Sequence, residues 1–187
     1  MHTKEIREKA IEAFEPIFIK QGYDWVDLDE VAKTAAVELR DIKHEFPNKA
    51  LLCSSWMEMT DIRAKKHHRE LLSSGKSGRV ILDQYFEELE NFMIKFGFKG
   101  CPFTNASRAL RGKSEPEIEE RIREHKGEIR NFFLRLCERV NSQSAHLGET
   151  LFLIYSGATT ESANMQSMNP IQSGRQASLA LFDLYSR

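Results

Sequence analysis

Three side chains that could contact nucleic acid lie close together between residues 38 and 45. Arg40, Lys43 and His44 occupy a short segment with helical periodicity. Arginine can bond to a guanine edge or to a phosphate, whereas lysine binds phosphate as a compact point charge. The alternative is the solvated face of a short surface helix, so the chemistry of these residues depends on the elements that position them.

Two short helices with a tight connection are predicted to position this segment. The first covers residues 27–35 and the second residues 38–45, with Ala36 and Val37 between them. Pro47 cannot continue a helix and therefore ends the second one. This layout is typical of a helix-turn-helix, whose second helix can enter the major groove of DNA.

The rest of the chain also has helical periodicity, and no segment shows convincing β alternation. The sequence therefore predicts an all-α fold of about nine helices, in which helices near residues 3–21 and 48–72 flank the two short ones. Pro16 lies inside the first of these and predicts a kink, because proline removes a backbone hydrogen bond. The residues predicted to cap helix N-termini are Asp27, Ser114 and Asn169.

Small residues are frequent in the last two predicted helices, near residues 147–166 and 171–186. Small side chains allow close helix packing, so these helices are predicted to form an intermolecular four-helix bundle across a two-fold axis. We therefore expect a homodimer that forms through residues near 147–187.

Composition limits the class of protein. The 187 residues carry a net charge of −1, which argues against a surface that binds polyanions over its whole area. The three cysteines (Cys53, Cys101 and Cys137) are far apart and odd in number, as in a reduced cytoplasmic protein. The charged start of the chain is unlike a signal peptide, and no apolar run approaches the roughly 18 residues that span a bilayer. We expect a cytoplasmic protein without a membrane partner.

The order and spacing of four motifs resemble those of the TetR/AcrR family of bacterial transcriptional regulators. The motifs are Ile17-Phe18-x-x-x-Gly22-Tyr23, Val31-Ala32-x-x-Ala35-Ala36-Val37, Phe46-Pro47-Asn48-Lys49-x-x-Leu52 and Gly100-Cys101-Pro102-Phe103-x-Asn105. The resemblance implies a three-helix DNA-binding head in residues 1–49 and a helical body for ligand binding and dimerisation in residues 50–187.

The resemblance also implies partners and site residues. The protein would bind operator DNA as a homodimer, usually as a repressor, and respond to a small apolar or amphipathic effector. The implied DNA contacts are Thr3, Arg40, Lys43, His44 and Lys49. The implied ligand contacts, each of which could instead be ordinary core, are Trp56, Met59, Phe86, Phe92, Phe103, Asn105, Phe133 and Tyr155. No cofactor or metal is expected.

The predicted recognition helix departs from the family pattern. Arg40 stands where glycine is common, and Asp41 and Lys43 replace threonine and tyrosine. Residues 1–49 contain eight Lys or Arg and eleven Asp or Glu, so their charge is about −3 before histidine is counted. Phosphate neutralisation supplies most non-specific DNA affinity. The alternative function is therefore a ligand-binding or protein-interaction module that does not recognise duplex DNA.

Other reactive residue types have less support. Cys101 precedes a predicted helix start, where it could be redox-sensitive, or it could be a small buried residue in a tight corner. Cys53 and Cys137 are expected in the core. His67 and His68 point to different helix faces, so a solvated basic face is favoured over a metal site. The sequence contains no recognisable catalytic triad, phosphate-binding glycine loop or metal-binding helix motif, so an enzyme is not expected.

Overall fold

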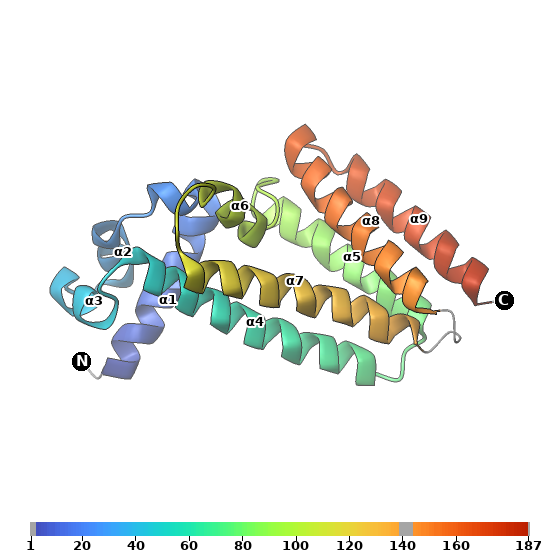
Figure 1. Ribbon diagram of the computed structural model, residues 1–187, viewed down its shortest axis with the longest axis horizontal. Helices are drawn as coiled ribbons and strands as arrows, with labels where there is room; N and C mark the ends of the chain where they lie inside the picture. The colour runs from blue at the N-terminus through green and yellow to red at the C-terminus, as the bar shows by residue number, and fades with distance from the viewer. Residues whose placement is uncertain (1–2, 139–143, 187) are drawn as a thin grey trace. The chain divides into compact units, whose positions relative to one another are not determined.

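The computed structural model describes residues 3–138 and 144–186, and in these residues it contains nine α-helices, one 3-10 turn and no strand (Figure 1). The predicted all-α fold class is confirmed. The elements are α1 (Thr3–Gln21), η1 (Tyr23–Trp25), α2 (Leu28–Ala35), α3 (Leu39–Glu45), α4 (Lys49–Ser73), α5 (Gly78–Lys95), α6 (Pro102–Ala109), α7 (Pro116–Cys137), α8 (Ser144–Met165) and α9 (Asn169–Tyr185).

The chain divides into two compact units. The first contains the chain up to Ile62 together with Pro102–His125, and the second contains Arg63–Cys101 together with the residues from Lys126 onward. The chain passes from one unit to the other inside α4, between residues 62 and 63, and inside α7, between residues 125 and 126. These two boundaries therefore do not fall at a loop. The predicted functional boundary between residues 49 and 50 remains a prediction, because compactness does not test it.

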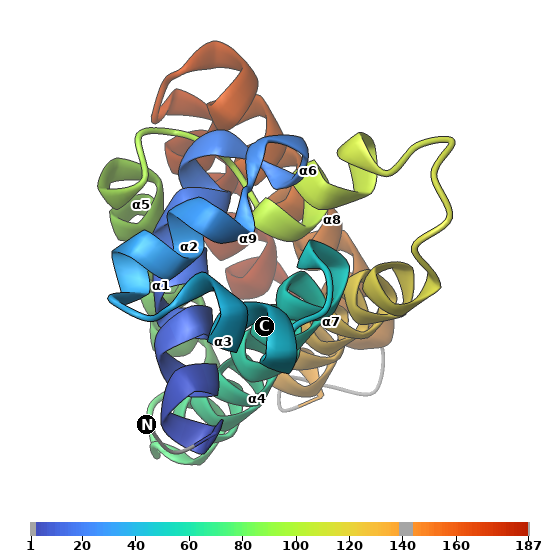
Figure 2. The same ribbon diagram turned by 90° about the vertical axis from the view of Figure 1, so that its left-hand side faces the viewer.

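Helix α1 supplies the core of the first unit. Its apolar stripe includes Phe14 and Phe18, which are stacked with ring centroids 5.1 Å apart and pack against Trp56 of α4. Helix α1 continues through Pro16 as one element. Helices α2 and α3 both pack against α1 and against each other, as Figure 2 shows. Helices α1, α2 and α3 therefore share one hydrophobic core.

The turn between α2 and α3 is set by local backbone conformation. Asp27 caps α2, because its carboxylate accepts a hydrogen bond from the backbone N–H of Asp29. Ala36 ends α2 in the left-handed conformation, with φ 52°. The backbone N–H of Val37 then donates to the carbonyl of Ala32 over 3.0 Å, which closes the helix end. These contacts fix the direction in which α3 leaves α2.

The second unit has an aromatic core and an antiparallel pair of helices at the C-terminus. Helices α8 and α9 lie side by side (Figure 1), and α9 also packs against α5. Gly174 of α9 makes this approach close, because a Cβ at this position would lie 3.0 Å from the Cβ of Ala158. Arg175 pairs with Asp83 at 2.7 Å and with Glu90 at 3.3 Å, so charged contacts also join α9 to α5.

Two of the three predicted helix caps were wrong by one residue. Helix α7 begins at Pro116, and the carbonyl of Glu115 accepts the first helical hydrogen bonds, because proline fits best at the first helical position. In α9 the cap residue is Met168, and the Ser167 hydroxyl accepts a hydrogen bond from the backbone N–H of Asn169. Among the residues that the structure describes, no helix is long and apolar enough to cross a membrane.

Candidate nucleic-acid interface

Helix α3 presents its polar residues to solvent because its apolar residues anchor it. Ile42 is completely buried, and Phe46, directly after the helix, is 1% exposed. Arg40, Lys43 and His44 are exposed. All three predicted contact residues in α3 are therefore available to an approaching ligand.

The acidic residues of α3 differ in exposure. Glu45 is largely turned inward, with 11% of its side chain exposed, and one of its oxygens lies 3.5 Å from Nδ1 of His44. Asp41 is 3.6 Å from Nε of Arg40. The contact between Arg40 and Asp41 lies at the surface, where ion pairs contribute about 0–1 kcal/mol. Arg40 can therefore exchange Asp41 for another anion at little cost.

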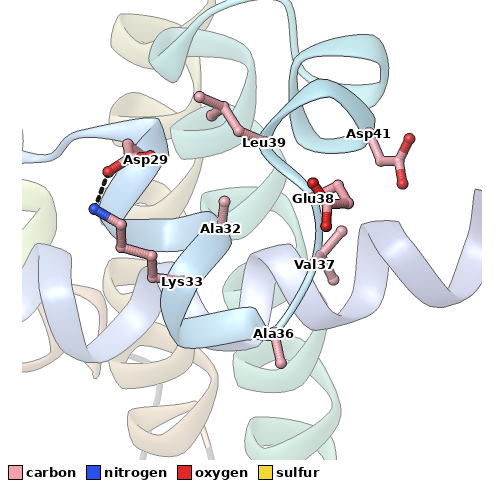
Figure 3. A pocket seen from close by; sticks show the side chains of 8 residues that line it. All are labelled: Asp29, Ala32, Lys33, Ala36, Val37, Glu38, Leu39 and Asp41. Atoms are coloured by element: carbon pink, nitrogen blue, oxygen red, sulfur yellow. Dashed lines mark ion pairs between the residues drawn. The ribbon is translucent and has the colours of Figure 1, made fainter.

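A hollow of about 460 Å³ lies where α2 meets α3. Figure 3 shows Asp29 and Lys33, which form an ion pair, on one side and Glu38 and Asp41 on the other. Three carboxylates and one ammonium give the lining a charge of −2. Ala32 lies between the two charged sides, and Val37 lies next to Glu38 (Figure 3). This acidic hollow adjoins the cationic residues of α3, so the interface carries both signs of charge.

Lys49 has a structural role that the sequence did not predict. Its Nζ donates hydrogen bonds of 3.0 Å to the backbone carbonyls of Tyr23 and Asp24, and it lies 4.9 Å from the centre of the Tyr23 ring. Through these two hydrogen bonds the first residue of α4 is joined to η1. The predicted phosphate contact of Lys49 remains a prediction that competes with this role.

The start of α1 contributes to the same region. Thr3 is exposed at the first position of α1. One turn later, the guanidinium of Arg7 lies 4.8 Å from the centre of the Phe46 ring and donates a hydrogen bond of 3.0 Å to the Ser55 hydroxyl. Arg7 therefore helps to position the end of α3. The sequence alone does not reveal this role, because the stacking partner is 39 residues away.

The predicted ligand contacts separate into two groups of four. Trp56, Met59, Phe103 and Asn105 belong to the first unit, whereas Phe86, Phe92, Phe133 and Tyr155 belong to the second.

The group in the first unit includes core aromatic rings. The indole N–H of Trp56 donates to the Glu15 carboxylate over 3.0 Å, and its ring centre lies 5.5 Å from that of Phe103. Phe103 in turn stacks on His125 at 3.7 Å. His125 is 2.9 Å from Asp61, and both residues are buried. The first unit thus contains a buried hydrogen-bonded His–Asp pair in contact with the Phe103 ring.

In the second unit, aromatic rings of the predicted group pack around Tyr155, which also contacts the ring of Tyr85. The rings of Phe133 and Phe86 lie 5.5 and 6.0 Å from that of Tyr155. Burial raises the pKa of the Tyr155 hydroxyl, and burial is also the main cause of the raised pKa of Tyr85. Both hydroxyls are therefore neutral at physiological pH and can act as hydrogen-bond donors.

His68 lies in the interior of the second unit. Only 3% of it is exposed, so the expected solvated basic face is wrong for this residue. Its Nε2 lies 3.0 Å from the Tyr85 hydroxyl and its Nδ1 lies 2.9 Å from Glu128. Its ring stacks on Phe132 at 4.5 Å. His67 is half-buried and contacts Glu88 at 2.6 Å. The two neighbouring histidines do point to different sides of α4, as expected.

The three cysteines lie in different environments. Cys53 and Cys137 are buried, as expected, and burial raises the pKa of the Cys137 thiol to about 12. A protonated thiol is a poor nucleophile, so these residues are structural. Cys101 is half-buried, and its Sγ lies 3.8 Å from Nζ of Lys126. Cys101 is therefore the most accessible of the three thiols.

Comparison with solved structures places this arrangement in a known fold. No protein-family model and no curated protein sequence matches the chain. A TetR-family transcriptional regulator from Streptomyces coelicolor is 16% identical, with a TM-score of 0.85 over 98% of this chain and 97% of that chain. NemR from E. coli in its reduced form is 18% identical, with a TM-score of 0.79 over 92% and 95%. A TetR transcriptional regulator from Legionella pneumophila is 14% identical, with a TM-score of 0.81 over 95% and 96%.

At these identities the likeness shows the fold. The chain has the fold of the TetR-family transcriptional regulators, over nearly the full length of both molecules in each pair.

Proposed function

We propose that this protein is a ligand-responsive transcriptional regulator, in the manner of a repressor, that binds operator DNA as a homodimer. The observation that carries the proposal is the orientation of α3. Ile42 is buried, whereas Arg40, Lys43 and His44 face solvent after a fixed turn from α2. The fold of this chain is similar to that of transcriptional regulators, which supports a regulatory function.

The residues of α3 are assigned different roles. Arg40 reads a base edge, since a guanidinium can bond to guanine through two donors. Lys43 neutralises a phosphate and contributes affinity that does not depend on sequence. His44 and Thr3 contact the backbone beside it. Glu45 does not oppose this contact strongly, because its side chain is turned away from solvent.

The test is selection of bound duplexes from a random pool at low salt, followed by sequencing. We expect an enriched palindrome for the wild-type protein. Arg40→Ala should broaden the enriched sequences, and Lys43→Ala should weaken retention of all duplexes alike. Lys20→Ala is a matched control, since Lys20 is an exposed cation at the other end of α1. Failure to retain any duplex would contradict the proposal.

A second function is favoured by the acidic hollow between α2 and α3. Its net charge of −2 suits a basic protein segment or a cationic ligand better than DNA. In this case the chain would act as an interaction or ligand-binding module without duplex recognition. Glu38→Gln with Asp41→Asn separates the two functions. These changes should strengthen duplex retention if DNA is the partner, and abolish binding if a basic partner occupies the hollow.

We assign the homodimer contact to α8 and α9. Leu153, Met165 and Leu184 stand out from these helices with 60–66% of each residue exposed. Gly157 is exposed, and a Cβ built there meets nothing within 4 Å. A second copy that packs its own helices on this face would bury the apolar side chains and use the glycine for close approach.

Gly157→Leu tests the dimer without a clash inside one chain. The new side chain enters open space, so the fold should persist while the dimer dissociates. Gly127→Leu is the matched control, because Gly127 also has open space and lies on α7. Sedimentation at tens of micromolar should give a dimer for the wild type and the control, and a monomer for Gly157→Leu. A monomeric wild type would contradict the assignment.

The effector is proposed to be a small apolar or amphipathic molecule bound by the body. Thermal unfolding of the protein with a library of such compounds should show a rise in Tm once the concentration of a binding compound exceeds its Kd. Replacing Tyr155 by Phe should reduce the rise if its hydroxyl anchors the ligand.

For Cys101, mass spectrometry after mild peroxide treatment tests redox sensitivity, with Cys137 as the buried control. Equal modification of both thiols would contradict a selective sensor.

A further inference from the structure

A second hollow, of about 370 Å³, lies at the corner between α6 and α7 in the first unit. It is lined by residues of the connecting loop and of the second turn of α7. The charged and apolar residues that define its chemistry are Arg111, Lys113, Arg123, Glu119, Leu110 and Ile122.

The lining carries a positive charge in a protein that is slightly acidic overall. Three cations and one carboxylate give +2, whereas the whole chain carries −1. A single exposed cation attracts an anion weakly, because solvent and salt screen it. Three cations around one hollow reinforce each other at the same point.

The cations are held by contacts that a ligand can replace. Arg123 donates to Glu120, one turn earlier on α7, and 63% of the Arg123 side chain is exposed. Nζ of Lys113 lies 2.5 Å from Asp24 in η1, and half of each side chain is exposed. Exposed ion pairs of this kind contribute about 0–1 kcal/mol. An anion in the hollow can therefore take over these donors at low cost.

The apolar lining indicates what accompanies the negative charge. Leu110 is 4% exposed and Ile122 is partly buried, so the hollow offers apolar surface below the cations. Binding sites commonly combine such surface with a few converging polar groups. A bare inorganic ion would use only the charges, whereas an organic anion would use both.

We propose that this hollow binds a small organic anion, a carboxylate or a phosphate ester on a compact apolar group. Arg111 and Arg123 hold the anionic group, Leu110 and Ile122 contact its apolar body, and Lys113 is shared between the ligand and Asp24. Because Asp24 belongs to η1 in the head, occupancy of the hollow weakens a contact between the corner and the head inside the first unit.

The experiment is calorimetric titration of the full chain at low salt with benzoate and with phenyl phosphate. Benzyl alcohol lacks the charge, and inorganic phosphate lacks the apolar body. We expect both organic anions to bind and both comparison compounds to bind at least about tenfold more weakly. The ratio of Kd values for the two organic anions distinguishes a carboxylate site from a phosphate site.

Variants locate the site. Arg111→Gln with Arg123→Gln should raise Kd about tenfold or more, since two charge-assisted contacts are lost. Arg108→Gln should change Kd less than about twofold, because Arg108 is an exposed cation of the same region outside the lining. Asp24→Asn should lower Kd, because Lys113 loses its competing carboxylate. This third variant gains binding, so a folding defect cannot imitate it.

The proposal is overturned if neither organic anion binds the wild type, if Arg108→Gln costs as much as the double variant, or if Asp24→Asn leaves Kd unchanged. Equal binding of inorganic phosphate and phenyl phosphate would overturn the role of Leu110 and Ile122. The titration contains no DNA, so its outcome is independent of the proposed regulatory function.

Discussion

Helix α3 and the aromatic core of the second unit use polar residues in opposite ways. In α3 the buried residue is Ile42, and the polar neighbours Lys43 and His44 are exposed. In the second unit His68 is buried between the Tyr85 hydroxyl and Glu128, with an aromatic ring stacked on its face.

This difference in burial distinguishes residues that the fold requires from surface residues that can change without loss of the fold. Exposed substitutions usually change stability by less than about 0.5 kcal/mol, so Lys43 could replace another residue in α3 while the helix remained in place. A buried histidine leaves its partners without hydrogen bonds when it is removed. The surface of α3 is therefore free to diverge, whereas the His68 contacts are constrained by packing.

The largest expected effect comes from neighbouring residues of α3. Ile42→Ala should destabilise the protein by about 2–5 kcal/mol, because it leaves a cavity in the core that α1, α2 and α3 share. Lys43→Ala should cost less than about 0.5 kcal/mol. Urea unfolding of both variants measures the contrast. Similar losses in the two variants would remove the distinction between core and surface in α3.

A smaller effect is expected for the two adjacent histidines of α4. His68→Phe keeps a ring against Phe132 but leaves Tyr85 and Glu128 without this partner, which should cost about 1–3 kcal/mol. His67→Phe should cost under about 1 kcal/mol, because its contact with Glu88 is half-exposed. Thermal unfolding compares them. If His68→Phe is the milder change, the buried pair is not a constraint.

Ala36 provides a test in the stabilising direction. Its φ of 52° is unfavourable for a side chain with a Cβ, so Ala36→Gly should stabilise the protein by about 0.5–1 kcal/mol. The adjacent Ala35→Gly should destabilise it, since Ala35 is the last helical residue of α2. Chemical unfolding reports both signs. Destabilisation by both changes would show that the turn is not strained.

The smallest expected effect concerns the contact of α9 with α5. The hydrogen bond from Arg175 lowers the pKa of Asp83. A lowered pKa in the folded state stabilises the protein above the unfolded pKa of about 3.9, and this stability is lost as the pH falls through the folded value. Arg175→Met should therefore cost about 0.5 kcal/mol at pH 7, discounted for exposure, and less at pH 3. A cost that grows on acidification would contradict this cause.

Local signals explain why much of the fold could be predicted. Pro47 ended α3 and Asp27 began α2 because both act within a few residues of their own position. The caps predicted at Ser114 and Asn169 were each wrong by one residue. A short motif around a proline is compatible with two helix starts that differ by one position.

The site was harder to predict because its contacts are distant in sequence. Lys49 bonds to carbonyls 25 and 26 residues earlier, and His68 meets Glu128, 60 residues later. The periodicity of a single helix cannot predict a contact with a residue so far away in the sequence. The exposure of Arg40 and Lys43 followed from helical spacing alone, because a buried Ile42 fixes which side of α3 faces solvent.

The central claim is that α3 binds duplex DNA through Lys43 and its neighbours. The most direct measurement is the dependence of the association constant on salt, for an enriched duplex with the wild type and with Lys43→Ala. Loss of one phosphate contact should reduce the slope of log K against log salt by about one and weaken binding to every duplex. An unchanged slope and affinity in the variant would show that α3 does not approach the DNA backbone through this residue.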